Sequence, residues 1–151
     1  MGMFDAFNIN ASGLTAQRYR MDVISENVAN ANTTRTADGT PYRRKVVTFE
    51  EKGNGIHSNF HNVFKTVRNR YGGNGVKVDA VYEDNWTDMN MVYDPSHPDA
   101  DENGYVTYPN VNIITEMTNL IDASRAYEAN ATAFEASKAM AMQGLNIGQS
   151  S

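Results

Sequence analysis

"ASRAYEANATAFEASKAMAM", residues 123–142, is the stretch of sequence that decides the fold. Its alanine content favours a helix and lets a neighbouring backbone approach closely. The helical pattern extends over residues 111–143, a length of about 50 Å at the usual rise per residue. Apolar residues repeat every seven positions along it, with further apolar or small residues on companion positions, as in a coiled-coil contact line. The repeat consists of Ile113, Leu120, Tyr127, Phe134 and Ala141. The companion positions hold Met117, Ser124, Ala131 and Leu145, with Lys138 as the exception. Gly144 is the predicted end of the helix.

A second long helix is predicted over residues 5–31, about 40 Å in length. It has the same seven-residue repeat, with Ile24 and Ala31 on companion positions. The short segment between the two helices offers too little surface to cover both apolar lines, so we expect the two ends of the chain to pack on each other as a coiled coil. The predicted contact line, called the assembly seam below, consists of Phe7, Leu14, Met21, Val28, Ile113, Met117, Leu120, Tyr127 and Phe134.

The first helix runs into "SENVANANTT", residues 25–34, which is rich in residues that compete for backbone hydrogen bonds. A single Asn would be enough to end a helix. The helix-stop motif predicted here consists of Asn27, Asn30, Asn32, Thr33 and Thr34.

The segment between the helices has the composition of β-structure. Residues 42–52 and 75–84 are dense in Val, Tyr, Phe and Thr, and residues 62–71 and 103–111 are weaker strand candidates. Glycine- and proline-containing turns separate them. The predicted class is therefore α+β, with an N-terminal helix and stop motif at 1–36, a β-rich insert at 37–109 and a C-terminal helix at 110–151.

The charge distribution says more than the net charge of −5, which itself argues against nucleic acid as a partner. Residues 35–77 carry nine Lys and Arg against three Asp and Glu, whereas residues 78–124 carry ten Asp and Glu and no Lys or Arg. Either the fold pairs its own two stretches, or the basic stretch of one copy meets the acidic stretch of another. Contacts between copies would then involve Arg43, Arg44, Lys45, Asp99 and Asp101.

Few residues suggest chemistry. Asp99, Asp101, Asn103 and Gly104 match early positions of a calcium loop, but Asn110 stands where a bidentate Glu is needed, so an acidic turn is the plainer interpretation. His57 and His61 have the spacing of a shared metal site without a third ligand. The chain has no cysteine and no catalytic fingerprint. We therefore expect no enzyme activity and no cofactor.

Both ends of the chain resemble a known family. "SGLTAQRYRMDVISENVANANTTRT" (12–36) and "YPNVNIITEMTNLIDASRAYEANATAFEASKAMAMQGLNIG" (108–148) are similar to the flagellar axial proteins, the rod, hook and hook-associated subunits. Two stretches of the insert, "GTPYRRKVVTFE" (39–50) and "DPSHPDADENGYVTYPNVN" (94–112), narrow the resemblance to proximal-rod subunits of the basal body. The resemblance covers nearly the whole chain.

The resemblance implies a structural subunit that assembles into a helical tube, transmits torque and surrounds the export channel. Its partners would be itself, other rod subunits and the flagellar export apparatus. Its location would be the periplasmic rod. The sequence shows neither a cleaved signal peptide nor a membrane span. Two rival functions remain: a soluble coiled-coil adaptor, or a weak Ca²⁺-binding interaction protein.

Two further expectations concern assembly. The uncharged helix-stop motif is either a plain stop or a contact between copies. Its lack of charge suits a contact, because charged helix ends repeated at close quarters would repel one another. Residues 1–34 and 111–151 are expected to be disordered in the free subunit and to fold on assembly, since long helices without a packed face are marginal in water.

Overall fold

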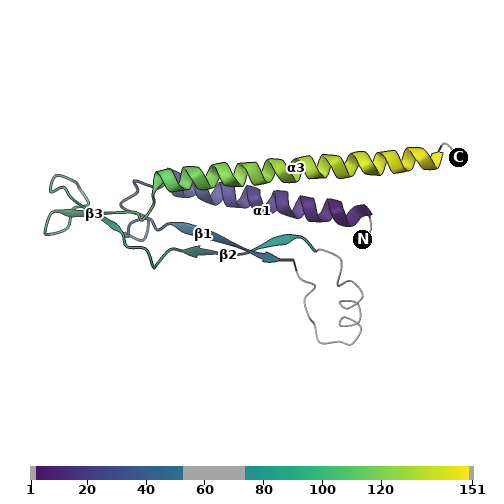
Figure 1. The fold of residues 1–151 in the computed structure, drawn as a ribbon. Helices are drawn as coiled ribbons and strands as arrows, with labels where there is room; N and C mark the ends of the chain where they lie inside the picture. The colour runs from purple at the N-terminus through teal and green to yellow at the C-terminus, as the bar shows by residue number, and fades with distance from the viewer. Residues whose placement is uncertain (1–2, 53–73, 150–151) are drawn as a thin grey trace, which may run out of the picture. The chain divides into compact units, whose positions relative to one another are not determined.

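The computed structural model describes residues 3–52 and 74–149 and confirms the α+β class (Figure 1). The order of elements is α1 (Met3–Ala29), β1 (Lys45–Glu51), β2 (Val76–Glu83), β3 (Asn90–Tyr93), β4 (Tyr105–Tyr108) and α3 (Ile113–Gln149). The strands lie between the two long helices in the sequence, as predicted.

The prediction that α3 ends at Gly144 is wrong, because the helix continues to Gln149. Gly144 is absent from the glycines with positive φ, and a Cβ placed on it would meet nothing within 4 Å. It is therefore an ordinary interior glycine, which weakens a helix by only about 1 kcal/mol relative to alanine. The other helix ends two residues earlier than predicted, at Ala29, where the Asn30 amide still donates to Glu26 O at 3.1 Å.

The strands form two separate two-stranded sheets among the described residues. In one, β1 pairs with β2, and the amide of Asp84 donates to Arg44 O at 2.8 Å. In the other, β3 and β4 are antiparallel, with Met91 opposite Thr107 and Val92 opposite Val106. Strand β3 was not predicted, although the run Met91–Tyr93 is β-prone. The strand predicted at 62–71 lies outside the described residues.

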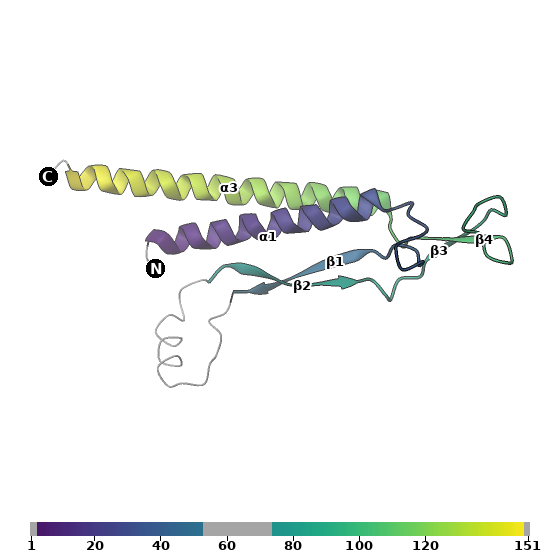
Figure 2. The ribbon, with the colours of Figure 1, turned by 180° about the vertical axis from the view of Figure 1, so that it is seen from behind.

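Contacts divide the chain into two units, which are described in turn. Unit 1 comprises residues 1–18, 49–79 and 124–151. In it the first half of α1 lies beside the second half of α3 (Figures 1 and 2). The rings of Phe7 and Phe134 meet edge to face at 5.2 Å, and Asn10 Nδ2 donates to Ser137 Oγ at 3.4 Å. Gly13 allows close approach, since a Cβ there would lie 2.9 Å from Oδ1 of Asn130.

Unit 2 comprises residues 19–48 and 80–123. Its buried apolar residues are few and mostly small: Val23, Ile24, Ala31, Tyr42, Val106, Pro109, Val111 and Ala123. Beside them four polar or charged residues are also buried, namely Asn27, Asp84, Asn110 and Glu116. A core with so large a polar share depends on complete hydrogen bonding, because each unpaired buried group would be destabilising.

Candidate functional site

Asn27 is the centre of a buried hydrogen-bond network in unit 2. Its side chain, 0% exposed, lies two residues before the end of α1. The amide Nδ2 donates to Lys45 O at 2.8 Å and to Glu116 Oε2 at 3.0 Å. Oδ1 accepts from the Tyr42 hydroxyl and from the Lys45 amide, both at 2.9 Å. These four bonds use the full capacity of a carboxamide and connect α1 to β1 and α3.

Glu116 supplies the charge of the network from the first turn of α3. Asn112 precedes the helix and caps it, because its Oδ1 accepts from the amides of Ile114 at 3.0 Å and Thr115 at 3.2 Å. An acidic residue in the first turn also interacts favourably with the helix dipole. Glu116, 1% exposed, accepts from Arg44 Nη2 at 2.8 Å and from Arg44 Nε at 2.9 Å. The charge-assisted pair compensates for burying the carboxylate.

Asp84 and Asn110 attach the end of β2 and the segment before α3 to the same arginine. Asn110 Oδ1 accepts from the Arg44 amide at 2.9 Å, while its Nδ2 donates to Asp84 O at 2.9 Å. Burial of Asp84 acts to raise its pKa. Hydrogen bonds from the Thr87 side chain and amide and from the Trp86 amide, with the charge of Arg44, outweigh burial and hold that pKa below its ordinary value. Arg44 Nη1 lies 3.7 Å from Asp84 Oδ2.

Tyr42 completes this set. Burial, followed by the charges of Glu26, Glu116 and Glu83, raises the pKa of Tyr42 to about 12. Its hydroxyl, protonated at neutral pH, donates to Asn27. We call Asn27, Tyr42, Arg44, Asp84, Asn110 and Glu116 the polar junction.

The polar junction has no free group for a substrate. Within residues 3–52 and 74–149, the one buried side-chain nitrogen or oxygen without a hydrogen-bond partner is Gln17 Oε1, which belongs to unit 1. Catalysis needs groups that face a reactant, whereas the polar groups of the junction are engaged with one another. The arrangement joins α1, β1, β2 and α3.

Comparisons with protein families and with single relatives all match this chain to flagellar basal-body rod proteins. Residues 7–35 match the model of the flagella basal body rod protein family, and residues 102–147 match that of the flagellar basal body rod FlgEFG protein C-terminal family. The chain is 46% identical to flagellar basal-body rod protein FlgC of Bacillus subtilis, over 99% of this chain and 100% of the relative. The chain belongs to the FlgC family of flagellar basal-body rod proteins.

Two further FlgC relatives support this assignment. The Borreliella burgdorferi protein is 44% identical over 97% of this chain and 98% of its own length, and an Escherichia coli O6:H1 protein is 37% identical over 99% and 100%. The resemblance to axial proteins is thereby confirmed. Because the relatives are named as rod proteins, the assignment also supports the prediction that the chain is structural and is not an enzyme.

The helix-stop motif of this FlgC-family chain has several distinct roles. Asn27 belongs to the polar junction. Asn30 caps the helix end, with Nδ2 donating to Glu26 O at 2.9 Å and Oδ1 accepting from Thr33 at 3.1 Å. Thr34 donates to Asp99 Oδ2 at 2.8 Å, and Asn32 is exposed. The uncharged amides and hydroxyls are thus mostly engaged within the chain.

The predicted assembly seam is only partly covered in one copy. Two of its members on α3 are exposed, Ile113 by 43% and Met117 by 54%. The other seam residues are half-buried: Phe7, Leu14, Met21, Val28, Leu120, Tyr127 and Phe134. The more buried line on α3 contains Glu116 and Ala123, and continues through Asn130 and Ser137. This line repeats every seven residues, as the predicted line through Met117 does, and it lies one residue earlier in the sequence. The periodicity of the sequence could therefore have revealed the buried line.

The charged residues predicted for contacts between copies mostly have partners within the chain. Arg44 is in the polar junction, Lys45 pairs with Glu26, and Asp99 lies 3.7 Å from Arg35. Asp101 accepts from the Asn103 and Tyr105 amides in a turn. Ion pairs of Arg35 and Arg44 join the basic stretch 35–77 to the acidic stretch 78–124, which supports pairing of the fold's own stretches.

The calcium-loop residues form a turn. Asp101 accepts backbone amides, Gly104 has φ of 80°, and Asn110 belongs to the polar junction instead of facing the loop. In the described part of the chain, no group of three or more His, Asp or Glu side chains is placed to hold a metal ion. His57 and His61 lie outside the described residues.

Proposed function

We propose that the chain is a structural subunit of the flagellar proximal rod that assembles with copies of itself and with other rod subunits into a helical tube. The observation that carries this proposal is the 46% identity to a named rod protein over 99% of this chain and 100% of that protein. The polar junction supports it, because a subunit under torque needs its helices fixed to its strands.

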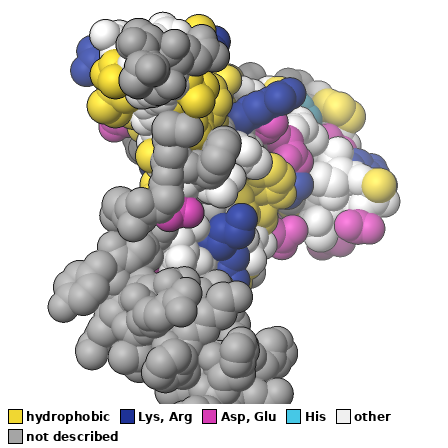
Figure 3. Space-filling view, turned by 90° about the vertical axis from the view of Figure 1, so that its right-hand side faces the viewer, with side chains coloured by type: hydrophobic (Ala, Val, Ile, Leu, Met, Phe, Trp, Pro, Cys, Tyr) yellow, Lys and Arg dark blue, Asp and Glu magenta, His cyan; other side chains and the backbone are white. Residues whose placement is uncertain are grey.

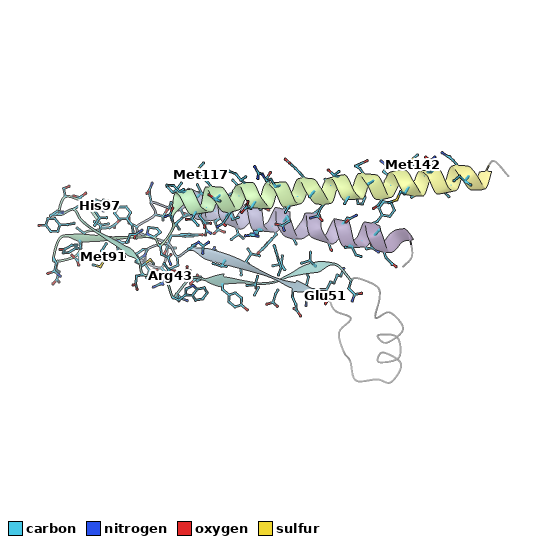
Figure 4. The ribbon with its side chains drawn as sticks, viewed as in Figure 1. Arg43, Glu51, Met91, His97, Met117 and Met142 are labelled. Atoms are coloured by element: carbon cyan, nitrogen blue, oxygen red, sulfur yellow. The ribbon has the colours of Figure 1, made fainter. Side chains whose placement is uncertain are left out.

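The long helices are proposed to form the packed core of the tube, with residues 1–36 and 110–151 in coiled-coil contact and residues 37–109 outside them. Ile114, Met117 and Ile121 support this arrangement, with exposures of 78%, 54% and 52%. Their spacing of three and four residues places them on one stripe of α3. Figure 4 shows Met117 on the side of α3 directed away from α1. Helices of neighbouring copies would cover this stripe.

The same proposal includes a route and a location. The subunit would pass through the flagellar export apparatus without a cleaved signal peptide, and the tube would surround the export channel in the periplasm. None of the helices in the described ranges has the length and hydropathy required to cross a membrane.

Among the charged residues, Arg43 and Asp101 are the ones we propose for contacts between copies, since Arg44 and Asp99 already have ion-pair partners.

The proposal is tested by complementing a strain that lacks its own proximal-rod subunit. The wild-type chain should appear in purified basal bodies and restore motility. Met117→Asp should reduce incorporation at least tenfold, because it places a charge in an apolar contact. Thr115→Asp is the matched control, exposed on the same helix and nearly opposite Met117. Absence of the wild-type chain from basal bodies would refute the proposed function.

A further inference from the structure

An apolar groove lies in unit 2 where α1 ends, α3 begins and the β3–β4 sheet approaches them. Its volume is about 660 Å³, and its apolar lining includes Ala31, Met91, Val92, Tyr108, Val111 and Ile113. Asn32 and Asn90 supply the polar rim, and none of the described residues that line it is charged. Met91 and Val92 remain 63% and 49% exposed. This groove is a surface suited to an uncharged, apolar partner.

The last turns of α3 have the matching character. Met140, Met142 and Leu145 are 69%, 57% and 62% exposed, and residues 139–151 contain no charged side chain. At 100° per residue, Met140 and Met142 point to nearly opposite sides of the helix. Figure 3, which faces the ends of the two helices, shows hydrophobic side chains at the surface there, and Figure 4 labels Met142. A helix that is apolar on several sides is normally buried by protein.

This helix end cannot fill the groove of its own chain while it remains helical. The groove includes Ile113, and the helical rise separates that residue from Met140 by about 40 Å along the axis of α3. The last turns of α3 can therefore reach such a groove only in another copy of the chain. A second copy of this chain offers the uncharged, apolar helix that the groove fits.

We propose that the groove binds the last turns of α3 from a second copy of this chain, by insertion of Met142 and Leu145 between Val92 and Val111. This inference rests on the proposed rod function, which requires contacts between copies. The contact is heterologous, since the groove and the inserted helix are different surfaces. Repeating such a contact gives a ring or an open helical assembly. An amphipathic or apolar helix in a hydrophobic groove is a common mode of recognition.

The test is disulfide formation between two single-cysteine variants. The sequence contains no cysteine, so each introduced thiol is the only one in its chain. Val92→Cys and Leu145→Cys copies are co-expressed in the complemented strain, and basal bodies are isolated and oxidised. We expect a dimer that contains one copy of each variant, identified by mass spectrometry of the joined peptides. Asn90→Cys with Gln143→Cys is the second pair, in case either first substitution prevents folding.

Two controls make the result interpretable. Asn103→Cys, in an exposed turn that does not line the groove, should give no dimer with Leu145→Cys. A double variant with cysteines at Met91 and Thr107, which are opposite each other in β3 and β4, reports that oxidation works. Incorporation of the wild-type chain reports the proposed function separately. If single-cysteine copies are incorporated and the oxidation control reacts, the absence of mixed dimers for both pairs overturns the groove proposal. Crosslinking of Leu145→Cys to a different protein overturns it as well.

Discussion

The beginning and the end of α3 differ in how much of their contact surface one chain completes. At residues 113–123, Glu116 and Ala123 are buried, and Glu116 has a charged hydrogen-bond partner in Arg44, just before β1, and a neutral one in Asn27 of α1. At residues 140–147, Met140, Met142 and Leu145 remain more than half exposed. Both ends of α3 thus expose apolar side chains, but only its beginning also carries a buried polar line that is satisfied within the chain.

The difference lies in how selective the two kinds of contact are. Polar groups buried together require specific partners and tolerate few alternative arrangements. Exposed apolar groups gain stability from any suitable neighbour, at about 25 cal/mol per Å² buried. We therefore assign subunit geometry to the polar junction and assembly to the exposed faces of α3.

Glu116→Ala should have the largest effect on the isolated chain. It removes the closer of the two carboxylates beside Arg44 and one of the two acceptors of Asn27 Nδ2. Truncating one member of a buried pair costs about 3–5 kcal/mol. The lower part of that range applies, because the Arg44 side chain is 25% exposed. Urea unfolding measures the change. Glu50→Ala, which breaks an exposed pair with Lys77, is the control and should change the free energy of unfolding by less than about 1 kcal/mol. Equal effects would contradict the importance of the junction.

Asn27→Ala should destabilise by about 2–3 kcal/mol, since buried groups of Tyr42, Lys45 and Glu116 each lose a partner. Asn32→Ala is a matched control in the same motif, because Asn32 is exposed, and it should change the stability by no more than about 0.5 kcal/mol. The same urea titrations compare the two variants. A tolerated Asn27→Ala would reduce the motif to a simple helix stop.

Alkaline pH should produce a smaller effect through Tyr42. Its pKa in the folded chain, about 12, exceeds the ordinary value of 10. The unfolded chain therefore ionises this tyrosine first, so the stabilisation is complete below pH 10 and is lost as pH rises from 10 to about 12. Thermal unfolding across this range should show a steeper decline for the wild type than for Tyr42→Phe. Parallel curves would show that Tyr42 does not carry the shift.

The smallest effect distinguishes two glycines. Gly144→Ala should increase the helical content, because alanine favours a helix by about 1 kcal/mol over glycine. A Cβ at this position meets nothing within 4 Å. Gly13→Ala should show little or no gain, since its Cβ would lie 2.9 Å from Asn130 Oδ1 and displace that side chain. Circular dichroism of the free chain measures both. A clear gain at Gly13 would indicate that α1 and α3 separate there in solution.

The sequence predicted the two helices and the main strands because their repeats are long and regular. It did not predict β3, a four-residue strand whose pairing with β4 depends on tertiary contacts. Gly144 misled the prediction of a helix end, because a glycine signals a stop only when the backbone turns to positive φ.

The polar junction was predicted only in fragments. Asn27 and Arg44 stood out as a helix stop and as part of a basic cluster, but Tyr42, Asp84, Asn110 and Glu116 gave no comparable signal. Their association depends on four segments meeting in space, which no local pattern reports. Leu120, Tyr127 and Phe134 combine equally well with a seven-residue line through Glu116 or with one through Met117. The sequence does not distinguish the two patterns, and packing determines which of the two residues faces inward.

The most direct test of this account is amide hydrogen exchange of the purified, unassembled chain, followed by mass spectrometry of short peptides. Protection should be high at residues 20–29 and 113–123, where the polar junction holds both helices, and low at residues 135–149. This prediction replaces the expectation that residues 1–34 and 111–151 are both disordered before assembly, because it limits low protection in α3 to residues 135–149. Uniformly slow exchange along α3 to its end would contradict the account, because the apolar end would then already be covered within one chain.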